Sequence, residues 1–588
     1  MFRITKLKSF NNLFKSIGNR NAGINSIFRS LISTSPKHFT NEENKASKYT
    51  TFEDMTAIRR IEAQKSLLVQ VNSEKSHKEL CSYCSQFGKL KSSFYYNLSE
   101  DLNFILLEFD EISGCEDALR SSSFNEDHPA IPVISPFLWF KARDSSKPKS
   151  VDKNKEVPNL IHQEVKCLDE NKLDEILTSA ETIDDQILIL HRLTQLNELG
   201  IRIRYIAGHQ LEMALNGMFP KIQACLFGSS VNGFGKIGCD LDLILRLNDD
   251  CGDITGSRLI YHTKMSRLNG RSQTQRQMEV IGDLMHIFLP AINNVRKILN
   301  ARVPIIKYNH ECLDLDIDFS MSNMTGFYMS ELLYLYGEID ERVRPLVFCL
   351  RKWASVVGLT NSSSPGRWIT NFSLTVMVLF FLQNVKNPIL PSMSVLTKSA
   401  SPNDIRVTDD NINCTFLRDL NKLSFKIENT ESLHHLLLQF FEFYSTFNFQ
   451  QNGISLIEGR PIVKPDHSAI WITNPLEPLL NVSKNVSYEE LEKLKLETRN
   501  AAWILESTID KNKDPSSWGL MSLLRSKKRV VKPEMFFKSR IVDVTDLFKD
   551  DSIKDYDNIS YKNTAIKSAV KQIQKSTQRE ITKLMKNI

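Results

Sequence analysis

The chain has 588 residues, of which 41% are hydrophobic and 24% are charged, the composition of an ordinary globular protein with room for three or four domains. This composition excludes a fibrous or wholly disordered chain, and ten cysteines without regular spacing exclude a disulfide framework. The net charge is only +6, so any affinity for nucleic acid has to come from local basic clusters.

The N-terminal segment, residues 1–41, has the composition of a targeting sequence. It contains no Asp or Glu, several serines and seven Lys or Arg, and Phe2, Leu7 and Phe10 are spaced along a plausible helix. This pattern predicts a mitochondrial transit peptide over 1–41, and with it a location in the mitochondrial matrix. A disordered basic tail that contacts RNA is the alternative.

Residues 60–145 follow a strand-helix-strand-strand-helix-strand order. The expected elements are 65–71, 77–86, 92–98, 103–109, 115–121 and 134–140. This order is typical of the RNA-recognition motif and predicts an RRM-like α/β domain. Such domains stack bases on aromatic residues of their central strands, and the aromatic residues here match those positions only loosely: Phe94, Tyr95, Tyr96, Phe104 and Phe109. A degenerate module used for packing is the alternative. Residues 144–157 read as a linker.

A short turn then precedes an acidic strand. The turn is Phe227-Gly228-Ser229, and the strand begins with Asp240 and Asp242. Because successive side chains of a strand alternate faces, the two carboxylates share one face. They repel each other unless a cation lies between them, and Mg²⁺ prefers carboxylate oxygen. The pair therefore predicts a Mg²⁺ or Mn²⁺ site for phosphoryl transfer. Taken alone, the acids would be a solvated strand end and the Gly-Ser pair an ordinary turn.

A third carboxylate is expected on a later strand, where Asp314, Asp316 and Asp318 alternate with apolar residues and are predicted to share a face. A calcium site or a charged sheet edge is the alternative for this strand. The insertion 252–300 between the second and third acids carries basic residues in its first half. They either guide RNA toward the metals or form a solvated loop.

The remaining chain reads as helices followed by a basic tail. The longest apolar run, 374–382, is too short to span a bilayer and predicts a buried helix, so no membrane span is expected. The tail, 511–588, ends in a lysine-rich stretch with a partial helical stripe of apolar residues. This stretch is either a basic helix that follows RNA or a solvated end.

Four further motifs occur in a fixed order after the acids. They are Ser330-Glu331-Leu332-Leu333-Tyr334, Arg342-Val343-Arg344-Pro345-Leu346-Val347, Trp368-Ile369-Thr370-Asn371-Phe372-Ser373-Leu374-Thr375, and Ile472-Thr473-Asn474-Pro475-Leu476-Glu477 with the following 481–486. Together with the turn and the acids, they make the chain resemble the DNA polymerase β-type nucleotidyltransferase superfamily. Within it, the chain is most similar to the mitochondrial poly(A) polymerases.

The resemblance implies an α+β fold. It places a polymerase β-type nucleotidyltransferase palm at 158–330 and a mainly helical PAP-associated domain for nucleotide recognition at 331–510. The RRM-like domain precedes them, and in this family a similar N-terminal domain supports homodimerisation. A homodimer through that domain is therefore implied here.

The resemblance also implies site residues. The catalytic and metal-binding residues are Asp240, Asp242 and Asp318. Asp318 is preferred because the family pattern continues with a serine and an asparagine, here Ser320 and Asn323, while Asp316 is the alternative. The nucleotide-binding residues are Phe227, Gly228, Ser229, Asn323, Arg351, Phe372 and Asn481.

The resemblance also implies a role for some of the nucleotide-binding residues. Phe372 is expected to stack on the incoming base, and Arg351 to contact the triphosphate, although a second basic position of the family is Ser355 here. Asn481 either frames the base pocket or caps the following helix. Leu480 stands where uridine-adding relatives commonly have histidine, which favours ATP.

The expected function is template-independent addition of AMP from ATP to RNA 3′ ends, the polyadenylation of mitochondrial RNA, by two-metal nucleotidyl transfer. A terminal RNA uridylyltransferase on the same scaffold is one alternative. A catalytically silent RNA-binding scaffold is the other.

Overall fold

A computed structural model describes residues 49–123, 134–140, 157–217, 219, 222–247, 270–321, 324–361, 366–508 and 518–525. The chain divides into two units, and all of these residues belong to the first, residues 1–528. The expected transit peptide, Asn323, nearly all of the expected linker and most of the basic tail lie outside the described residues.

The N-terminal part folds around a five-stranded sheet of order β4-β1-β3-β2-β5. Its elements are α3 (Phe52–Gln64), β1 (Ser66–Val71), η1 (Glu74–Ser76), α4 (His77–Cys84), β2 (Leu90–Ser99), β3 (Leu102–Phe109), α5 (Ile112–Arg120), β4 (Phe137–Trp139) and β5 (Leu160–His162). The order of helices and strands agrees with the prediction, but the direction of β4 does not follow the RRM pattern. In that pattern β4 is antiparallel to β1 because the α5 crossover makes it parallel to β3. Here β4 is parallel to β1, with Leu68 opposite Phe137.

Both faces of this sheet are covered. One face packs on α4 and α5 through residues such as Leu67 and Ile105. The other carries Phe94, Tyr96 and Phe104, which are 4%, 2% and 2% exposed and share a hydrophobic core with the next sheet. The rings that an RNA-recognition motif would offer to bases are therefore used for packing.

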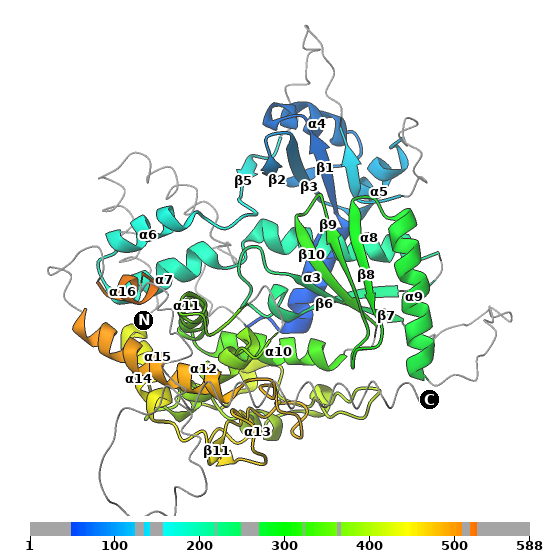
Figure 1. The fold of residues 1–588 in the computed structure, drawn as a ribbon. Helices are drawn as coiled ribbons and strands as arrows, with labels where there is room; N and C mark the ends of the chain where they lie inside the picture. The colour runs from blue at the N-terminus through cyan, green and yellow to red at the C-terminus, as the bar shows by residue number, and fades with distance from the viewer. Residues whose placement is uncertain are drawn as a thin grey trace, which may run out of the picture. The chain divides into compact units, whose positions relative to one another are not determined.

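The second sheet has the order β6-β7-β10-β9-β8. Its part of the chain contains α6 (Glu170–Ser179), α7 (Ile183–Thr194), α8 (Glu198–Leu215), β6 (Ile222–Phe227), η2 (Gly228–Ser230), β7 (Leu241–Leu247), α9 (Gly270–Phe288), β8 (Ile292–Ile298), β9 (Ile305–His310) and β10 (Leu315–Ser320). β7 and β10 pair in parallel, and the other neighbours are antiparallel. Helices α8 and α9 accompany this sheet (Figure 1), and Leu241, Leu243 and Leu245 are buried in the shared core, as the alternation of β7 predicts.

The remaining described residues are mainly helical. They form α10 (Met324–Ile339), α11 (Val343–Val356), α12 (Asn371–Asn384), α13 (Met393–Lys398), η3 (Pro402–Asp404), η4 (Leu420–Lys422), α14 (Leu433–Thr446), β11 (Asn452–Gly453), β12 (Ile462–Val463), α15 (Tyr488–Ser507) and α16 (Leu520–Leu524). The apolar run 374–382 lies in α12 and is buried throughout. Over the described ranges, no helix has the length and apolarity that crossing a membrane requires.

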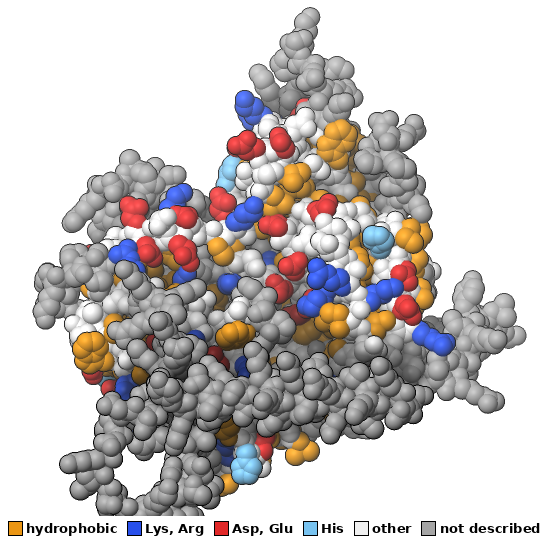
Figure 2. Space-filling model, viewed as in Figure 1, with side chains coloured by type: hydrophobic (Ala, Val, Ile, Leu, Met, Phe, Trp, Pro, Cys, Tyr) orange, Lys and Arg blue, Asp and Glu red, His pale blue; other side chains and the backbone are white. Residues whose placement is uncertain are grey.

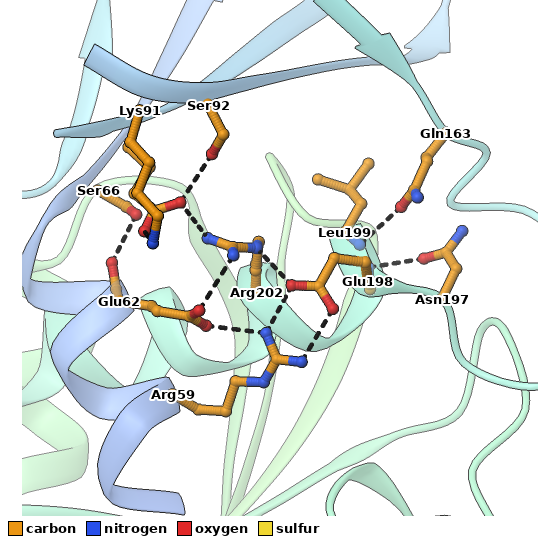
Figure 3. Close-up of polar contacts among 12 residues, drawn as sticks. Arg59, Glu62, Ser66, Lys91, Ser92, Gln163, Asn197, Glu198, Leu199 and Arg202 are labelled. Carbon is orange, nitrogen blue, oxygen red and sulfur yellow. Dashed lines mark hydrogen bonds and ion pairs between the residues drawn. The ribbon is translucent and has the colours of Figure 1, made fainter. Parts of the chain in front are cut away.

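An ion-pair network joins α3, α8 and the N-terminal sheet (Figure 3). Arg59 pairs with Glu198 at 2.5 Å, and Arg202 pairs with Glu198 at 2.7 Å, Glu108 at 2.9 Å and Glu62 at 3.2 Å. Burial raises the pKa of Glu198, but Arg59 and Arg202 outweigh it and hold that pKa below its ordinary value. The N-terminal sheet is thus attached to α8 by charge as well as by apolar packing.

Candidate active site

The Gly-Ser turn begins where β6 ends. Gly228 has a φ of +72°, which favours glycine, and a Cβ built there would lie 2.1 Å from Oδ2 of Asp242. Its N–H donates to Oγ of Ser330 on α10 at 2.7 Å. Phe227 precedes the turn and is the cross-strand partner of Asp242, and Ser229 lies half-buried within the turn. A glycine is therefore needed for the turn to pass this close to the first strand of acids.

Asp242 and Asp318 are side by side. They are direct partners on the parallel strands β7 and β10, so their side chains emerge on the same face. Asp240 lies just before β7, and Asp316 is two residues before Asp318 and accepts a 3.1 Å hydrogen bond from Asn309 Nδ2. The structure thus brings both candidate third acids to the Asp-x-Asp pair.

Burial and mutual repulsion both raise the pKa values of Asp240 and Asp242. Burial raises the pKa of Asp242 to about 7, and the charges of Asp318 and Asp240 add to the effect. Burial also raises the pKa of Asp240, with contributions from Asp316 and Asp318. Such shifts are expected where carboxylates are both buried and held near like charges without a cation between them.

Asp314 does not belong to this group. It lies in the turn before β10, with a φ of +49°, so the alternation of the strand does not extend to it. The prediction that it shares a face with Asp316 and Asp318 is wrong for that reason.

The donors at this site suit a divalent cation. Carboxylate oxygens are the ligands that Mg²⁺ and Mn²⁺ prefer, and the raised pKa of Asp242 shows that a positive charge would stabilise the group. Nζ of Lys307 on β9 forms an ion pair with Oδ2 of Asp318. In the part of the chain that the structure describes, no three His, Cys, Asp or Glu side chains form a ready-made metal cluster. The donor set suits a hard cation, and a lysine ammonium already occupies one carboxylate oxygen.

A buried arginine that the sequence reasoning missed holds this region together. Arg204 on α8 is 2% exposed and donates to Oγ of Ser230 at 3.1 Å, to the carbonyl oxygen of Gly200 at 2.8 Å and to that of Cys239. Oγ of Ser230 in turn donates to the carbonyl oxygen of Asp240 at 2.9 Å. The available signal was a charged residue between Ile203 and Tyr205 in an apolar stretch.

Replacing Arg204 by lysine is expected to lower kcat by about 10- to 100-fold, the usual effect of removing a group that orients a ligand. A lysine ammonium lacks the planar fork that serves three acceptors. Steady-state extension kinetics would measure the change. Arg202→Lys is the matched control, since Arg202 is also a nearly buried arginine of α8 but faces the N-terminal sheet. Equal loss of kcat in both variants would mean general damage to α8 and would contradict the role assigned to Arg204.

The nucleotide-binding candidates of the helical region lie near the start of α12. Phe372 is the second residue of α12 and is half-buried against the helical core. Arg351 on α11 donates to Oγ1 of Thr375 at 3.0 Å and to the carbonyl oxygen of Phe234 at 2.7 Å, and burial lowers its pKa to about 10. Arg351 therefore ties α12 to the loop that follows the Gly-Ser turn, in addition to any contact with phosphate.

Asn481 is engaged within the protein. Its Oδ1 accepts from the N–H groups of Ile472 at 3.1 Å and Ser483 at 2.9 Å, and its Nδ2 donates to Oγ of Ser468 at 3.1 Å and the carbonyl oxygen of Ile470 at 2.9 Å. It does not cap α15, whose N-cap is Ser487. The helix-cap alternative is therefore wrong.

The loop that Asn481 braces reaches α12. Oγ of Ser483 donates to Oγ of Ser373 at 2.9 Å, one residue after Phe372. The structure thus places the Asn481 loop and the first turn of α12 side by side, whereas Asn323 lies outside the described residues.

Two family models match the chain. The model described as "Poly(A) RNA polymerase, mitochondrial-like, central palm domain" matches residues 183–338. The model described as "Cid1 family poly A polymerase" matches residues 432–480. The first match contains the Gly-Ser turn and the candidate metal-binding acids Asp240, Asp242, Asp316 and Asp318. The second match ends one residue before Asn481.

Curated relatives and solved structures agree with these models. The mitochondrial poly(A) RNA polymerase of Drosophila melanogaster is 49% identical over 558 residues, 91% of each chain. The human protein of the same name is 38% identical over 484 residues, 80% of this chain and 81% of the human one. A crystal structure of mtPAP in complex with ATPgammaS has a TM-score of 0.73 and 35% identity, covering 81% of this chain and 99% of that one. The α+β fold with a nucleotidyltransferase palm and a helical PAP-associated region is thereby confirmed.

Proposed function

Because the chain belongs to the family of mitochondrial poly(A) RNA polymerases, we propose that it extends RNA 3′ ends with AMP taken from ATP, without a template. It is a polynucleotide adenylyltransferase. The observation that supports this chemistry most directly is the pairing of Asp242 with Asp318 on adjacent parallel strands beside a turn that only glycine can make.

In the proposed mechanism Asp240, Asp242 and Asp318 hold Mg²⁺ or Mn²⁺, with Asp316 as the alternative to Asp318. The bound metals would lower the pKa of the RNA 3′-hydroxyl and neutralise charge on the leaving pyrophosphate. Asp318 is preferred to Asp316 because it is the direct partner of Asp242, while Asp316 is exposed and accepts from Asn309. By holding the metals, the acids would orient the RNA 3′-hydroxyl toward the α-phosphate of ATP. The 3′-hydroxyl is the nucleophile, so no side-chain nucleophile is needed.

The turn and the helical region would hold ATP. The Gly228 N–H is already used by Ser330, so Gly228 contributes close approach, and Ser229 offers its N–H and hydroxyl to the triphosphate. Phe372 presents a ring on which the base can stack. Asn481 keeps the loop at 468–483 in place through four hydrogen bonds, and so shapes the pocket without having to contact the base.

The nucleotide preference can be tested with one nucleoside triphosphate at a time. The assay combines a labelled oligoribonucleotide, Mg²⁺ or Mn²⁺ and the protein lacking residues 1–41. We expect ATP to support extension of the oligoribonucleotide. Leu480 has no polar group that could read the edge of uracil, and its backbone is fixed by hydrogen bonds to Asn474 and Glu477. A UTP preference would identify a uridylyltransferase, and RNA binding without any extension would identify a silent scaffold.

The location and the assembly state belong to the same proposal. The relatives are named as mitochondrial proteins, which supports a mitochondrial location, and residues 1–41 would direct the chain to the matrix. A homodimer through the N-terminal sheet would have to use surfaces other than the Phe94 and Tyr96 face, which is buried against the palm.

A further inference from the structure

A single row of side chains crosses the palm sheet from one edge to the other. Direct cross-strand partners run from Phe227 on β6 to Asp242 on β7, Asp318 on β10, Lys307 on β9 and Arg296 on β8. Residues directly opposite each other in a sheet project on the same face. A bulge on β8 between residues 293 and 296, where Asn294 has a φ of +52°, sets the register in which Arg296 faces Lys307.

The charge of the side chains in this row changes from negative to positive after Asp318 on the middle strand, β10. Its first half holds the proposed metal-binding acids, and its second half is basic. The side chain of Lys307 is 45% exposed although it pairs with Asp318, and Arg296 is exposed. On the face drawn in Figure 2, acidic and basic side chains occur together, which agrees with the small net charge.

The acids have different neighbours on their two sides. The Gly-Ser turn, proposed above for the triphosphate, follows β6 and so lies on one side of Asp242. Lys307 and Arg296 lie on the opposite side of Asp318, about 5 and 10 Å from it at the usual spacing of strands. An RNA whose 3′-hydroxyl reaches the acids has to bring its last phosphates close to these carboxylates, which repel them.

We propose that Lys307 and Arg296 bind the phosphates of the RNA strand next to its 3′ end, and that Lys307 exchanges Asp318 for an RNA phosphate when the site is loaded. This inference rests on the proposed function and names its RNA-contacting residues. Phosphate contacts position a strand without reading its sequence, which suits an enzyme that extends RNA without a template. In this role lysine acts as a point charge, and arginine acts as a bidentate hydrogen-bond donor.

The first test is equilibrium RNA binding without ATP, measured by fluorescence anisotropy in Mg²⁺ at several salt concentrations. Lys307→Gln and Arg296→Gln are each expected to weaken binding severalfold. Each should reduce the slope of log K against log[salt] by about 0.7, the value for one contact to a single strand. Lys297→Gln is the matched control, since it removes the same charge one residue away on β8 but from a side chain that pairs with Asp283 of α9 at 2.7 Å.

A second variant separates the exchange from simple loss of charge. Asp318→Asn frees Lys307 from its ion pair and removes a charge that repels phosphate, so RNA binding should become tighter, opposite in sign to the effect of Lys307→Gln. In steady-state assays Arg296→Gln should raise the KM for RNA severalfold and leave the KM for ATP unchanged. An unchanged salt slope in both glutamine variants, or an effect on the KM for ATP alone, would overturn the proposal. Absence of extension by the unaltered protein would instead contradict the proposed function.

Discussion

Replacing Asp242 by asparagine is expected to reduce AMP incorporation by at least about 100-fold, since removing groups that only support a metal ligand already costs about 10- to 100-fold. Asp242 lies next to both the proposed third acid and the Gly-Ser turn. It is opposite Asp318, opposite Phe227 and against the backbone of Gly228. Single-nucleotide incorporation with ATP would measure the loss.

A second readout distinguishes a missing metal ligand from a damaged fold. Mg²⁺ or Mn²⁺ should raise the thermal unfolding temperature of the unaltered protein, because a ligand that binds only the folded state stabilises it. Asp242→Asn should lose this increase. Without metal, the variant should be at least as stable as the unaltered protein, because a neutral amide avoids both the cost of burying a charge and the repulsion from Asp318 and Asp240, which together raise the pKa of Asp242.

Asp314→Asn is the matched control for this variant. Asp314 is an acid of the segment that also carries Asp316 and Asp318, but it lies in the left-handed turn before β10, a conformation that asparagine tolerates well. Full activity is expected from it. Incorporation by Asp242→Asn at the level of Asp314→Asn would rule out the proposed metal site.

Replacing Gly228 by alanine is expected to have the second largest effect. The new Cβ would lie 2.1 Å from Oδ2 of Asp242 and 3.1 Å from its Cγ, so either the turn or the carboxylate has to move. A displacement of about 1 Å at a reacting centre can cost about 100-fold in rate. The variant should lose activity of this order in the incorporation assay and should also lose about 1–2 kcal/mol of stability because its φ is positive.

Gly358→Ala separates the two causes. Gly358 follows α11 with the same φ of +72°, and the nearest atom to its added Cβ is Nζ of Lys493 at 3.4 Å, an ordinary van der Waals distance. Denaturant unfolding should show a similar loss of stability for both variants, while only Gly228→Ala loses incorporation. If Gly358→Ala lost as much activity, backbone strain alone would explain the effect and the close approach to Asp242 would be irrelevant.

The RRM-like prediction shows where element order stops being informative. The positions of the strands and helices followed from local patterns, and they agree closely with the observed ones. Local patterns did not predict that β4 is parallel to β1. They also did not predict that the aromatic face of the N-terminal sheet packs against the palm. Phe94 and Tyr96 are apolar enough to pack and aromatic enough to stack, so only their burial against the palm decides between the two uses.

The sequence by itself determined the alternation that puts Asp240 and Asp242 on one face, the glycine at the turn, and the family, because these depend on local spacing and on the order of motifs. Only the tertiary structure decided that Asp318 faces Asp242, that Lys307 and Arg296 continue the row, that Arg204 supports the turn and that Asn481 braces its loop. Strand register and the partners of a buried polar group are contacts between segments far apart in the chain, and no local pattern encodes which segments meet.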